Sequence, residues 1–403
     1  MEKTEVVIVG GGPAGISTAL FLAHAAPELT DRIVVLEKAR YPREKPCAGG
    51  VGARADKLLS SIGVAVDVPS VWLDGVAFRA MGETLVVREG GIGRVVRRIE
   101  FDHELAKIAM GRRIRVLDGA KVGAIRKTAD GYEVESSAGS FSCKVLVGAD
   151  GVGSVVRKSL GFSATRYHAQ ALEVDTEHVE GDQPRDVILF DASNRKLPGY
   201  YWDFPTLVGG REMMCRGVYL LKTGKDDAPV EIQDLLAAEL AARGLDLAKC
   251  KKKRFAERGF ERHAPLSRER LLLIGEAAGI DPVTGEGIAQ AIQYGAVGGR
   301  YLARKWPHKD FGFGDWSDEV RRTMIGRDLY TRTLGVPLFY GEPRPAVERF
   351  LLSSPDFIRI GLQHFAGKRW SRAAIARASV KALGHTARFA LGRTSAEAEP
   401  ARD

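Results

Sequence analysis

The fold is decided near the N-terminus, by the stretch Val6-Val7-Ile8-Val9-Gly10-Gly11-Gly12-Pro13-Ala14-Gly15. A β-branched run, a glycine turn and a helix-forming run at residues 16–23 are typical of the first strand, turn and helix of a dinucleotide-binding unit. Gly10 permits the tight turn, Gly12 lets the backbone approach a pyrophosphate, and Gly15 lets the helix pack closely on the strand. Amide groups at the start of the helix then face the phosphates. We therefore predict a dinucleotide site at this turn.

The residue after the second predicted strand indicates which dinucleotide binds. Residues 33–36 form a buried strand pattern that ends at Glu37, roughly 20 residues beyond Gly15. This is the spacing expected for an acid that accepts hydrogen bonds from a ribose. A carboxylate at this place suits the unphosphorylated ribose of FAD or NAD and repels a 2′-phosphate.

Composition predicts a soluble protein of about two domains. The chain has 403 residues, of which 45% are hydrophobic and 28% charged. Residues 6–27 carry no charge, but four glycines and Pro13 interrupt the run, so a buried strand, turn and helix explain it better than a membrane span or signal peptide. The net charge of +9 favours anionic partners without choosing among them.

The cysteines argue against a disulfide framework and against a metal site. The four cysteines are scattered and form no C-x-x-C pair; they are Cys47, Cys143, Cys215 and Cys250. We therefore expect no metal and a reducing cytoplasm. Nothing in the sequence resembles a nucleic-acid-binding fold, so we expect no nucleic-acid partner.

Further along the chain, strand and helix patterns alternate. Residues 76–80 and 84–88 are predicted as antiparallel strands, Asp102 as a helix N-cap, and residues 122–135 as a hairpin. A buried strand at residues 145–147 leads into the stretch Gly148-Ala149-Asp150-Gly151. A mixed segment follows, which we interpret as an inserted second domain.

A second glycine-rich connection follows that segment. Residues 271–274 form another buried strand pattern, which leads into Gly275-Glu276-Ala277-Ala278-Gly279. The stretch Asp281-Pro282-Val283-Thr284-Gly285-Glu286-Gly287-Ile288 then opens a helix. Amide groups at that helix start would face an anionic or electron-rich group.

Together, the N-terminal turn with Glu37, the stretch 148–157 and the stretch 275–288 resemble the FAD-dependent oxidoreductases built like para-hydroxybenzoate hydroxylase. Two further stretches resemble signatures of the geranylgeranyl reductase family within that group. They are Lys45-Pro46-Cys47-Ala48-Gly49-Gly50 and Tyr200-Tyr201-Trp202-Asp203-Phe204-Pro205. The resemblance covers roughly residues 5–305.

The resemblance implies the fold and its division. It implies an α/β fold with a Rossmann-like FAD-binding domain at 1–165 and 260–305. An antiparallel-sheet substrate domain is inserted at 166–259, and a helical C-terminal region with a basic tail spans 306–403.

The resemblance also implies cofactor contacts. Ala14 and Gly15 would hold the pyrophosphate, Glu37 the adenosine ribose and Arg98 the phosphates. Val122 would contact adenine through its backbone, and the loop with Cys47, Ala48 and Gly50 would pass beside the isoalloxazine. Glu276 would bind the ribityl or pyrophosphate side, and Gly287 with Ile288 would offer amides to the pyrimidine end. The implied FAD-binding set is Gly10, Gly12, Pro13, Ala14, Gly15, Glu37, Cys47, Ala48, Gly50, Arg98, Val122, Asp150, Gly275, Glu276, Gly287 and Ile288.

The chain departs from the family at two of these positions. Glu276 stands where the family usually has Asp, and Ala48 where it usually has Gly. The longer carboxylate must fold back by one methylene, so flavin affinity or cofactor geometry is expected to differ.

The implied activity is reduction of carbon-carbon double bonds of a prenyl chain by hydride transfer from reduced flavin, with Cys47 or an ordered water as the proton donor. Tyr200, Trp202 and Phe204 alternate on one strand face and would form an apolar wall for the chain. Cys47 could instead be a small residue in a tight loop, and the aromatic residues could be simple core. The pattern aromatic-x-Trp-x-apolar-Pro at residues 200–205 also resembles a stretch of the flavin halogenases. A monooxygenase or halogenase acting on an aromatic or secondary-metabolite substrate therefore remains the alternative. The reductant, NAD(P)H or reduced ferredoxin, is undecided.

The C-terminal segment suggests a membrane partner. No Asp or Glu occurs between Arg359 and Arg393, and Arg377, Lys381 and Arg388 would share one helix face opposite Ile375. Such a helix could bind the inner face of an anionic membrane, or it could be an ordinary solvated helix. The partner expected from the family is a prenyl lipid or another hydrophobic small molecule.

Overall fold

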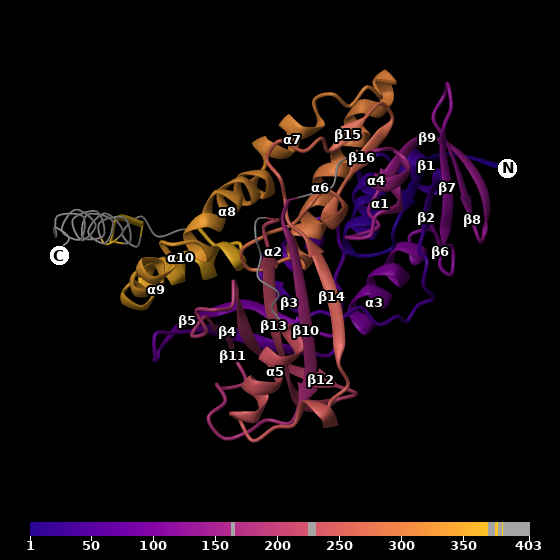
Figure 1. Ribbon diagram of the computed structural model, residues 1–403. Coiled ribbons are helices and arrows are strands. Elements are labelled where there is room, and N and C mark those ends of the chain that lie inside the picture. The colour runs from indigo at the N-terminus through magenta and orange to yellow at the C-terminus, as the bar shows by residue number, and fades with distance from the viewer. Residues whose placement is uncertain (163–165, 225–230, 370–374, 378–380, 382–403) are drawn as a thin grey trace.

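The structure is a computed structural model that describes residues 1–162, 166–224, 231–369, 375–377 and 381 (Figure 1). Two sheets and a set of C-terminal helices make up the described chain. This arrangement confirms the predicted α/β fold class with a Rossmann-like FAD-binding region.

The first sheet has a parallel core in the order β16-β9-β1-β2-β6. These strands are β1 (Glu2–Val9), β2 (Ile33–Leu36), β6 (Arg115–Leu117), β9 (Gly139–Gly148) and β16 (Leu271–Leu273). The apolar runs of the central strands are fully buried, as expected when helices cover both faces of a parallel sheet.

Antiparallel strands extend this sheet at its edges. The hairpin predicted at residues 122–135 is confirmed as β7 (Val122–Lys127) and β8 (Tyr132–Ser136), and β8 pairs with β9. On the other side, β15 (Ser267–Arg268) pairs with β16.

The second sheet has the order β14-β10-β13-β12-β11-β4-β5-β3. Its strands are β3 (Gly50–Gly52), β4 (Ser70–Ala80), β5 (Glu83–Val96), β10 (His168–Thr176), β11 (Val187–Asp191), β12 (Gly199–Val208), β13 (Arg211–Lys222) and β14 (Lys253–Arg258). All neighbours are antiparallel except β4 and β11, which run parallel.

Three strands of the second sheet come from the N-terminal segment that the sequence had assigned to the FAD-binding domain. The strands predicted at 76–80 and 84–88 are antiparallel, as β4 and β5, but β4 pairs with β11, far along the chain. An alternating pattern predicts a strand without naming its partner, so the structure places β3, β4 and β5 in the sheet that we had expected only from residues 166–259.

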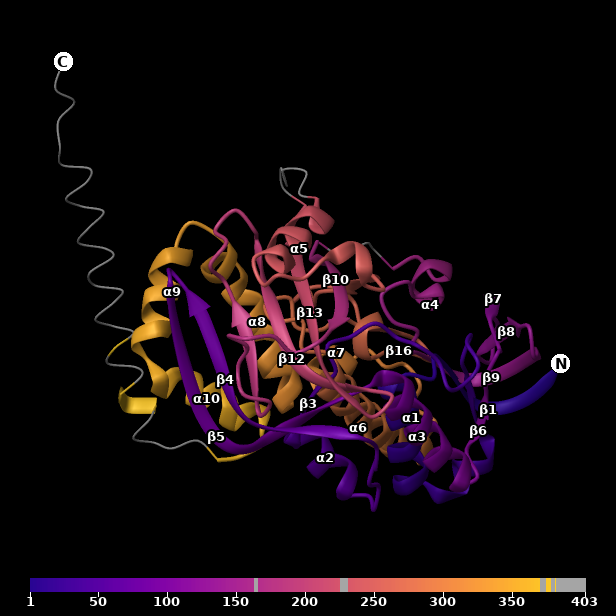
Figure 2. The same ribbon diagram turned by 90° about the horizontal axis from the view of Figure 1, so that it is seen from below.

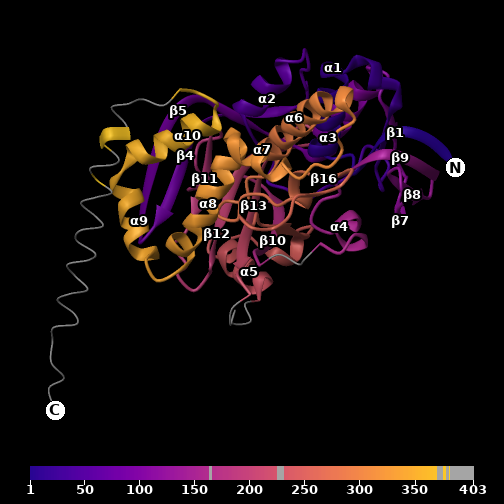
Figure 3. The same ribbon diagram turned by 90° about the horizontal axis from the view of Figure 1, so that it is seen from above.

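Helices α1 (Pro13–Ala25) and α6 (Ile288–Lys305) cross closely beside the first sheet (Figure 3). Glycines of α6 permit this contact: an added Cβ at Gly295 would lie 2.6 Å from the Ser17 Cβ, and one at Gly299 would lie 2.6 Å from the Leu22 nitrogen. The helix that follows the first glycine turn therefore packs on the helix that follows the second.

The remaining helices flank the two sheets. They are α2 (Ala53–Ser60), α3 (Arg98–Gly111), α4 (Val155–Ser159), α5 (Ile232–Ala241), α7 (Trp316–Arg322), α8 (Met324–Tyr340), α9 (Arg344–Ser353) and α10 (Pro355–Phe365), with short 3-10 turns at Pro27–Arg32, Leu247–Lys249, Gly275–Ala277 and Trp306–His308. Helices α9 and α10 lie against β4 and β5 (Figure 2). The C-terminal region thus covers part of the second sheet.

Candidate functional site

The N-terminal turn forms a cradle that only glycine can build. Gly10 has a φ of +106°, and an added Cβ would lie 2.3 Å from the Ala149 carbonyl oxygen. A Cβ at Gly15 would lie 1.9 Å from the Gly10 carbonyl oxygen. Helix α1 has Gly12 at its N-cap with no side-chain cap, so its first amides are available to an anionic group.

A cavity of about 580 Å³ opens beside this turn. This volume lies within the range of small-molecule sites. The predicted residues that line it are Gly10, Gly12, Pro13, Ala14, Glu37, Cys47, Arg98, Val122, Asp150, Glu276, Gly287 and Ile288. Residues from distant parts of the sequence therefore meet around one space, as the resemblance implies for FAD.

Four predicted residues lie behind the cavity wall. Gly15 packs on the turn, and an added Cβ at Gly275 would lie 2.5 Å from the Ala14 Cβ. Ala48 packs into the core of the second sheet, and Gly50 lies against the Phe204 ring. These four residues do not line the cavity, but their packing fixes the position of the residues that do.

At one end of the cavity the Glu37 carboxylate is held by backbone amides. Its Oε2 accepts from the Gly11 nitrogen at 2.9 Å, and its Oε1 accepts from the Ala39 nitrogen at 3.0 Å. Sequence analysis missed two neighbours, Tyr41 and Arg43. The Tyr41 hydroxyl donates to the Gly11 carbonyl, and the Arg43 Nε lies 3.5 Å from Glu37. Both residues lie in the loop between β2 and Cys47, and no motif in that loop marks them as neighbours of Glu37.

Arg98 lines the cavity from the start of α3. It makes a bidentate pair with Asp102, with Nε–Oδ1 at 2.6 Å and Nη2–Oδ2 at 2.7 Å. The prediction of Asp102 as an N-cap is wrong, because α3 begins at Arg98 and Asp102 lies one turn inside, where it fixes the arginine.

Cys47 lies between backbone and charged groups at the cavity. Its Sγ accepts from the Gly49 nitrogen at 3.4 Å, and its own nitrogen donates to Glu173 Oε1 at 3.0 Å. Burial raises the pKa of the thiol, and the positive charge of Arg98 opposes that shift. The thiol therefore keeps its proton at neutral pH.

Three partly buried acids line the cavity, and they differ in how fully their carboxyl groups are hydrogen-bonded. Asp150 accepts from the Ser154 hydroxyl at 2.6 Å and the Val155 nitrogen at 2.6 Å, at the start of α4. Glu276 accepts from the Arg258 nitrogen at 3.4 Å, and burial raises its pKa. Glu257 on β14 was missed by sequence analysis; its Oε2 is shielded and has no hydrogen-bond partner among the described residues.

Three tyrosines clamp the backbone of the second glycine loop. Tyr219 donates to the Pro282 carbonyl at 3.1 Å, and Tyr200 donates to the Thr284 carbonyl at 2.5 Å. Tyr340 donates to the carbonyl between them, that of Val283. The sheet and α8 thereby fix the loop that leads to Gly287, the N-cap of α6.

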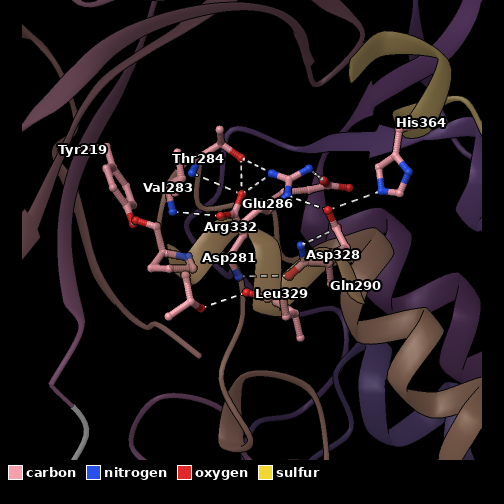
Figure 4. Close-up of polar contacts among 12 residues, drawn as sticks. Tyr219, Asp281, Val283, Thr284, Glu286, Gln290, Asp328, Leu329, Arg332 and His364 are labelled. Atoms are coloured by element: carbon pink, nitrogen blue, oxygen red, sulfur yellow. Dashed lines mark hydrogen bonds and ion pairs between the residues drawn. The ribbon is translucent and has the colours of Figure 1, made fainter. Parts of the chain in front are cut away.

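The side chains of the same loop are held by Arg332 of α8 (Figure 4). Arg332 pairs with Asp281, with Glu286 at 3.2 Å and with Asp328 at 2.8 Å. His364 of α10 lies 3.4 Å from Asp328 and extends this network to the last described long helix. We call Asp281, Glu286, Asp328, Arg332 and His364 the loop network.

The predicted aromatic residues share one face of β12. Their ring centroids lie close to other rings: Phe190–Tyr200 at 5.3 Å, Phe190–Phe204 at 5.4 Å and Tyr200–Trp202 at 6.3 Å. Trp202 lies over Gly217 of β13, and its Nε1 has no partner among the described residues. The three residues form a continuous wall.

Tyr200 also borders a second cavity of about 200 Å³. Its exposed surface is mostly apolar and comes from the second sheet and the C-terminal helices, including Val76, Phe339, Val347 and Ile358. Thr284 and the ion pair Arg344–Glu348 also line it. Trp202 and Phe204 do not line it; they lie in the adjoining buried core. The Tyr200–Thr284 hydrogen bond lies between this apolar cavity and the loop that borders the first.

Residues 3–305 match the family model described as the FAD binding domain. The chain belongs to this FAD-binding family. Menaquinone reductase of Mycobacterium tuberculosis is 28% identical over 350 residues, covering 76% of this chain and 79% of the relative. Digeranylgeranylglycerophospholipid reductase 2 of Methanothermobacter thermautotrophicus is 28% identical over 394 residues, covering 81% and 93%.

Two solved structures share the fold of this FAD-binding protein. A geranylgeranyl bacteriochlorophyll reductase-like protein from Thermoplasma acidophilum has a TM-score of 0.67 at 20% identity, covering 94% of this chain and 96% of that one. A flavin-dependent brominase has a TM-score of 0.68 at 19% identity, covering 95% and 100%. At such identities the structures show the fold alone. With the relatives, they confirm the resemblance to the geranylgeranyl reductase family of FAD-dependent oxidoreductases.

The predicted basic C-terminal helix lies mostly outside the described residues. Within them, Arg377 pairs with Asp356 at 2.7 Å and Lys381 donates to the Ser353 carbonyl at 2.6 Å. Among the described helices, none has the length and apolar character needed to span a membrane. The same residues contain no group of three or more His, Cys, Asp or Glu side chains placed to hold a metal ion.

Proposed function

We propose that this FAD-dependent oxidoreductase reduces carbon-carbon double bonds of a prenyl chain. The observation that carries the proposal is the aromatic face of β12, which adjoins both the loop of the cofactor cavity and the apolar cavity beneath the C-terminal helices. An isolated double bond needs a two-electron donor, an acid and a dry apolar site. In this proposal FAD, Cys47 and the apolar cavity meet these three requirements. The names of the relatives support the substrate class, because menaquinone and digeranylgeranylglycerophospholipids carry isoprenoid chains.

The residues around the first cavity fit FAD. The glycine cradle leaves space that a Cβ would fill, the Glu37 carboxylate lines the cavity where it would accept from a ribose, and α1 and α6 begin without side-chain caps. Arg98 also lines the cavity, and its guanidinium, which is paired with Asp102, would contact the phosphates. Reduced FAD supplies the hydride, which NAD(P)H or a reduced ferredoxin replenishes.

The chain must also supply a proton to the second carbon of the double bond. Cys47 lines the cofactor cavity with a thiol that stays neutral, and Arg98 would stabilise the thiolate left after proton transfer. We therefore keep Cys47 as the donor in this proposal.

Cys47→Ser is expected to lower turnover of a prenyl substrate by roughly 100-fold, the usual scale for loss of a general acid. FAD content should be unchanged, because the serine preserves the small side chain and the backbone contact with Glu173. The measurement is anaerobic single turnover, with the flavin spectrum as the control for cofactor binding. Full turnover in this variant would remove Cys47 from the role.

Val347 of α9 lines the apolar cavity and tests whether that cavity holds the chain. Val347→Trp should fill part of its 200 Å³ and raise the KM for a long prenyl substrate roughly tenfold, with little effect on a short one. Arg349→Trp, at an exposed position of the same helix, is the matched control. Equal effects of Val347→Trp on long and short chains would contradict this assignment.

The deciding experiment is anaerobic incubation of FAD-loaded protein with dithionite and geranylgeranyl lipids, followed by mass spectrometry. A gain of two hydrogens per reduced bond supports the proposal. Oxygen consumption that is stimulated by an aromatic substrate, without lipid reduction, would instead support the monooxygenase or halogenase alternative.

The same proposal gives the protein a cytoplasmic location with peripheral contact to the inner face of the membrane. A prenyl lipid resides in a bilayer, and the basic C-terminal segment carries charges suited to anionic lipids. Sedimentation with anionic vesicles, compared with neutral ones, tests the contact.

A further inference from the structure

Glu257 lies on the face of the second sheet that carries the aromatic wall. In the strand register, Phe255 of β14 is opposite Ala171, which is opposite Tyr219, which is opposite Tyr200. Directly paired residues share a face, and so do residues two apart on one strand. Glu257 therefore projects to the same side as Tyr219 and Tyr200, and it lines the cofactor cavity.

The carboxyl group meets the second glycine loop at Gly285. An added Cβ at Gly285 would lie 2.7 Å from Glu257 Oε2 and 3.0 Å from Tyr219 Cε2. Although Oε2 is shielded from solvent, no described residue forms a hydrogen bond with it. A shielded polar atom without a partner destabilises the folded protein, and a ligand that supplies the partner removes that cost.

The surroundings favour the neutral form of this carboxyl group. Burial raises the pKa of Glu257 well above its ordinary value, and the nearby carboxylates of Glu276, Asp281 and Glu173 raise it further. Lys45 is the positive group that opposes this shift. The other titratable groups that face it, Tyr200, Tyr219, Tyr340 and Cys47, also have pKa values raised mainly by burial. This shift favours the protonated form of Glu257, which is a hydrogen-bond donor.

The neighbouring hydroxyl donors are already engaged. Tyr200, Tyr219 and Tyr340 each donate to a carbonyl of the glycine loop. On this face Glu257 Oε2 and Trp202 Nε1 both lack a hydrogen-bond partner within the described chain, and of the two only Glu257 lines the first cavity. In its protonated form Glu257 has an O–H to which a ligand oxygen in that cavity can supply the acceptor.

We infer that Glu257 donates a hydrogen bond to a carbonyl oxygen on the headgroup of the prenyl substrate, as a quinone headgroup would present. The inference rests on the proposed function and narrows its substrate class from any prenyl lipid to one with a carbonyl-bearing ring. FAD also has carbonyl oxygens, so the experiment must separate the two ligands.

The test compares wild-type protein with Glu257→Gln by infrared difference spectroscopy and by equilibrium binding, without turnover. The probes are FAD, a short-chain menaquinone and a prenyl glyceryl ether that lacks a carbonyl. Wild-type protein should show the carbonyl band of a neutral carboxylic acid at pH 7, absent from Glu257→Gln, and this band should shift when the quinone is added to FAD-loaded protein. Quinone affinity should fall about tenfold in Glu257→Leu, which has no donor, and by less in Glu257→Gln, whose amide N–H can still donate, while FAD and ether affinities stay unchanged.

Glu269→Gln is the matched control, because Glu269 is an exposed acid paired with Lys127 at 2.8 Å. Glu257→Asp, which withdraws the acid by one methylene, provides a second variant if the amide fails to fold. The inference is overturned if the neutral-acid band is absent at pH 7, if FAD alone shifts it and the quinone does not, or if quinone and ether lose affinity equally. These readouts remain valid if prenyl reduction itself is not observed, so the two proposals can fail separately.

Discussion

Replacing Gly15 by alanine is expected to weaken FAD binding by about 100-fold. The added Cβ would lie 1.9 Å from the Gly10 carbonyl oxygen and 3.3 Å from the Ala149 Cβ, and both belong to rigid, buried segments. Overpacking of this kind costs about 1–3 kcal/mol, which corresponds to roughly 5- to 150-fold in a binding constant. We expect the upper end, because the turn that must shift is the one that we propose holds the pyrophosphate.

The measurement is FAD titration by flavin fluorescence on protein freed of cofactor. Gly361→Ala is the matched control, since Gly361 lies in α10 and an added Cβ there meets nothing within 4 Å. Circular dichroism of the cofactor-free Gly15→Ala protein shows whether the variant is folded. It therefore distinguishes weaker FAD binding by a folded protein from a failure to fold. Folded Gly15→Ala protein with wild-type affinity would contradict the role of the turn.

The turn could be predicted from sequence because its chemistry is local. Gly10, Gly12 and Gly15 are adjacent in the chain, and their spacing alone specifies a strand, a tight turn and a helix. Glu37 was predictable for the same reason, since the length of one βαβ unit fixes its distance from the turn. The resemblance then supplied residues that meet only in three dimensions, such as Arg98 and Glu276.

The residues that were missed depend on long-range pairing. Glu257 stands in a strand whose neighbours are β10 and the loop around Gly285, and no short spacing links these segments. Arg332 lies beyond residue 305, outside the region covered by the resemblance, and a single arginine in a helix carries no signal of its partners. Which strands pair with each other could not be predicted for the same reason. Strand β4, for example, pairs with β11, which lies far along the chain.

The loop network connects the C-terminal helices to the loop that borders the first cavity. Asp281 and Glu286 belong to the loop before α6, whereas Arg332 and Asp328 belong to α8. Arg54 of α2 also contacts Glu286 and lies 3.7 Å from Asp328. Because these groups are largely buried, each charge depends on the others for its compensation.

The second large effect is expected from Arg332→Ala, which should lower the free energy of unfolding by roughly 3–5 kcal/mol, the cost of removing one partner of a buried ion pair. Asp281 would lose its arginine entirely, Glu286 would keep only Arg54, and Asp328 would keep Arg54 and His364. Urea unfolding monitored by circular dichroism measures the change. Arg327→Ala, at an exposed position of the same helix, is the matched control and should change stability by less than about 0.5 kcal/mol.

The pH dependence of the stability of Arg332→Ala gives a sharper test than the size of its stability loss at a single pH. Burial alone would raise the pKa of Asp328, but the hydrogen bond from His364 and the charges of Arg332 and Arg54 hold it below the ordinary value. A depressed folded-state pKa contributes stability above about pH 4, the unfolded value, and that contribution is lost as the pH falls toward the folded value. Wild-type protein should therefore lose more stability on acidification than Arg332→Ala. Parallel pH curves for the two proteins would show that Arg332 does not sustain the charge of Asp328, and the loop would then owe its position to the tyrosine clamp.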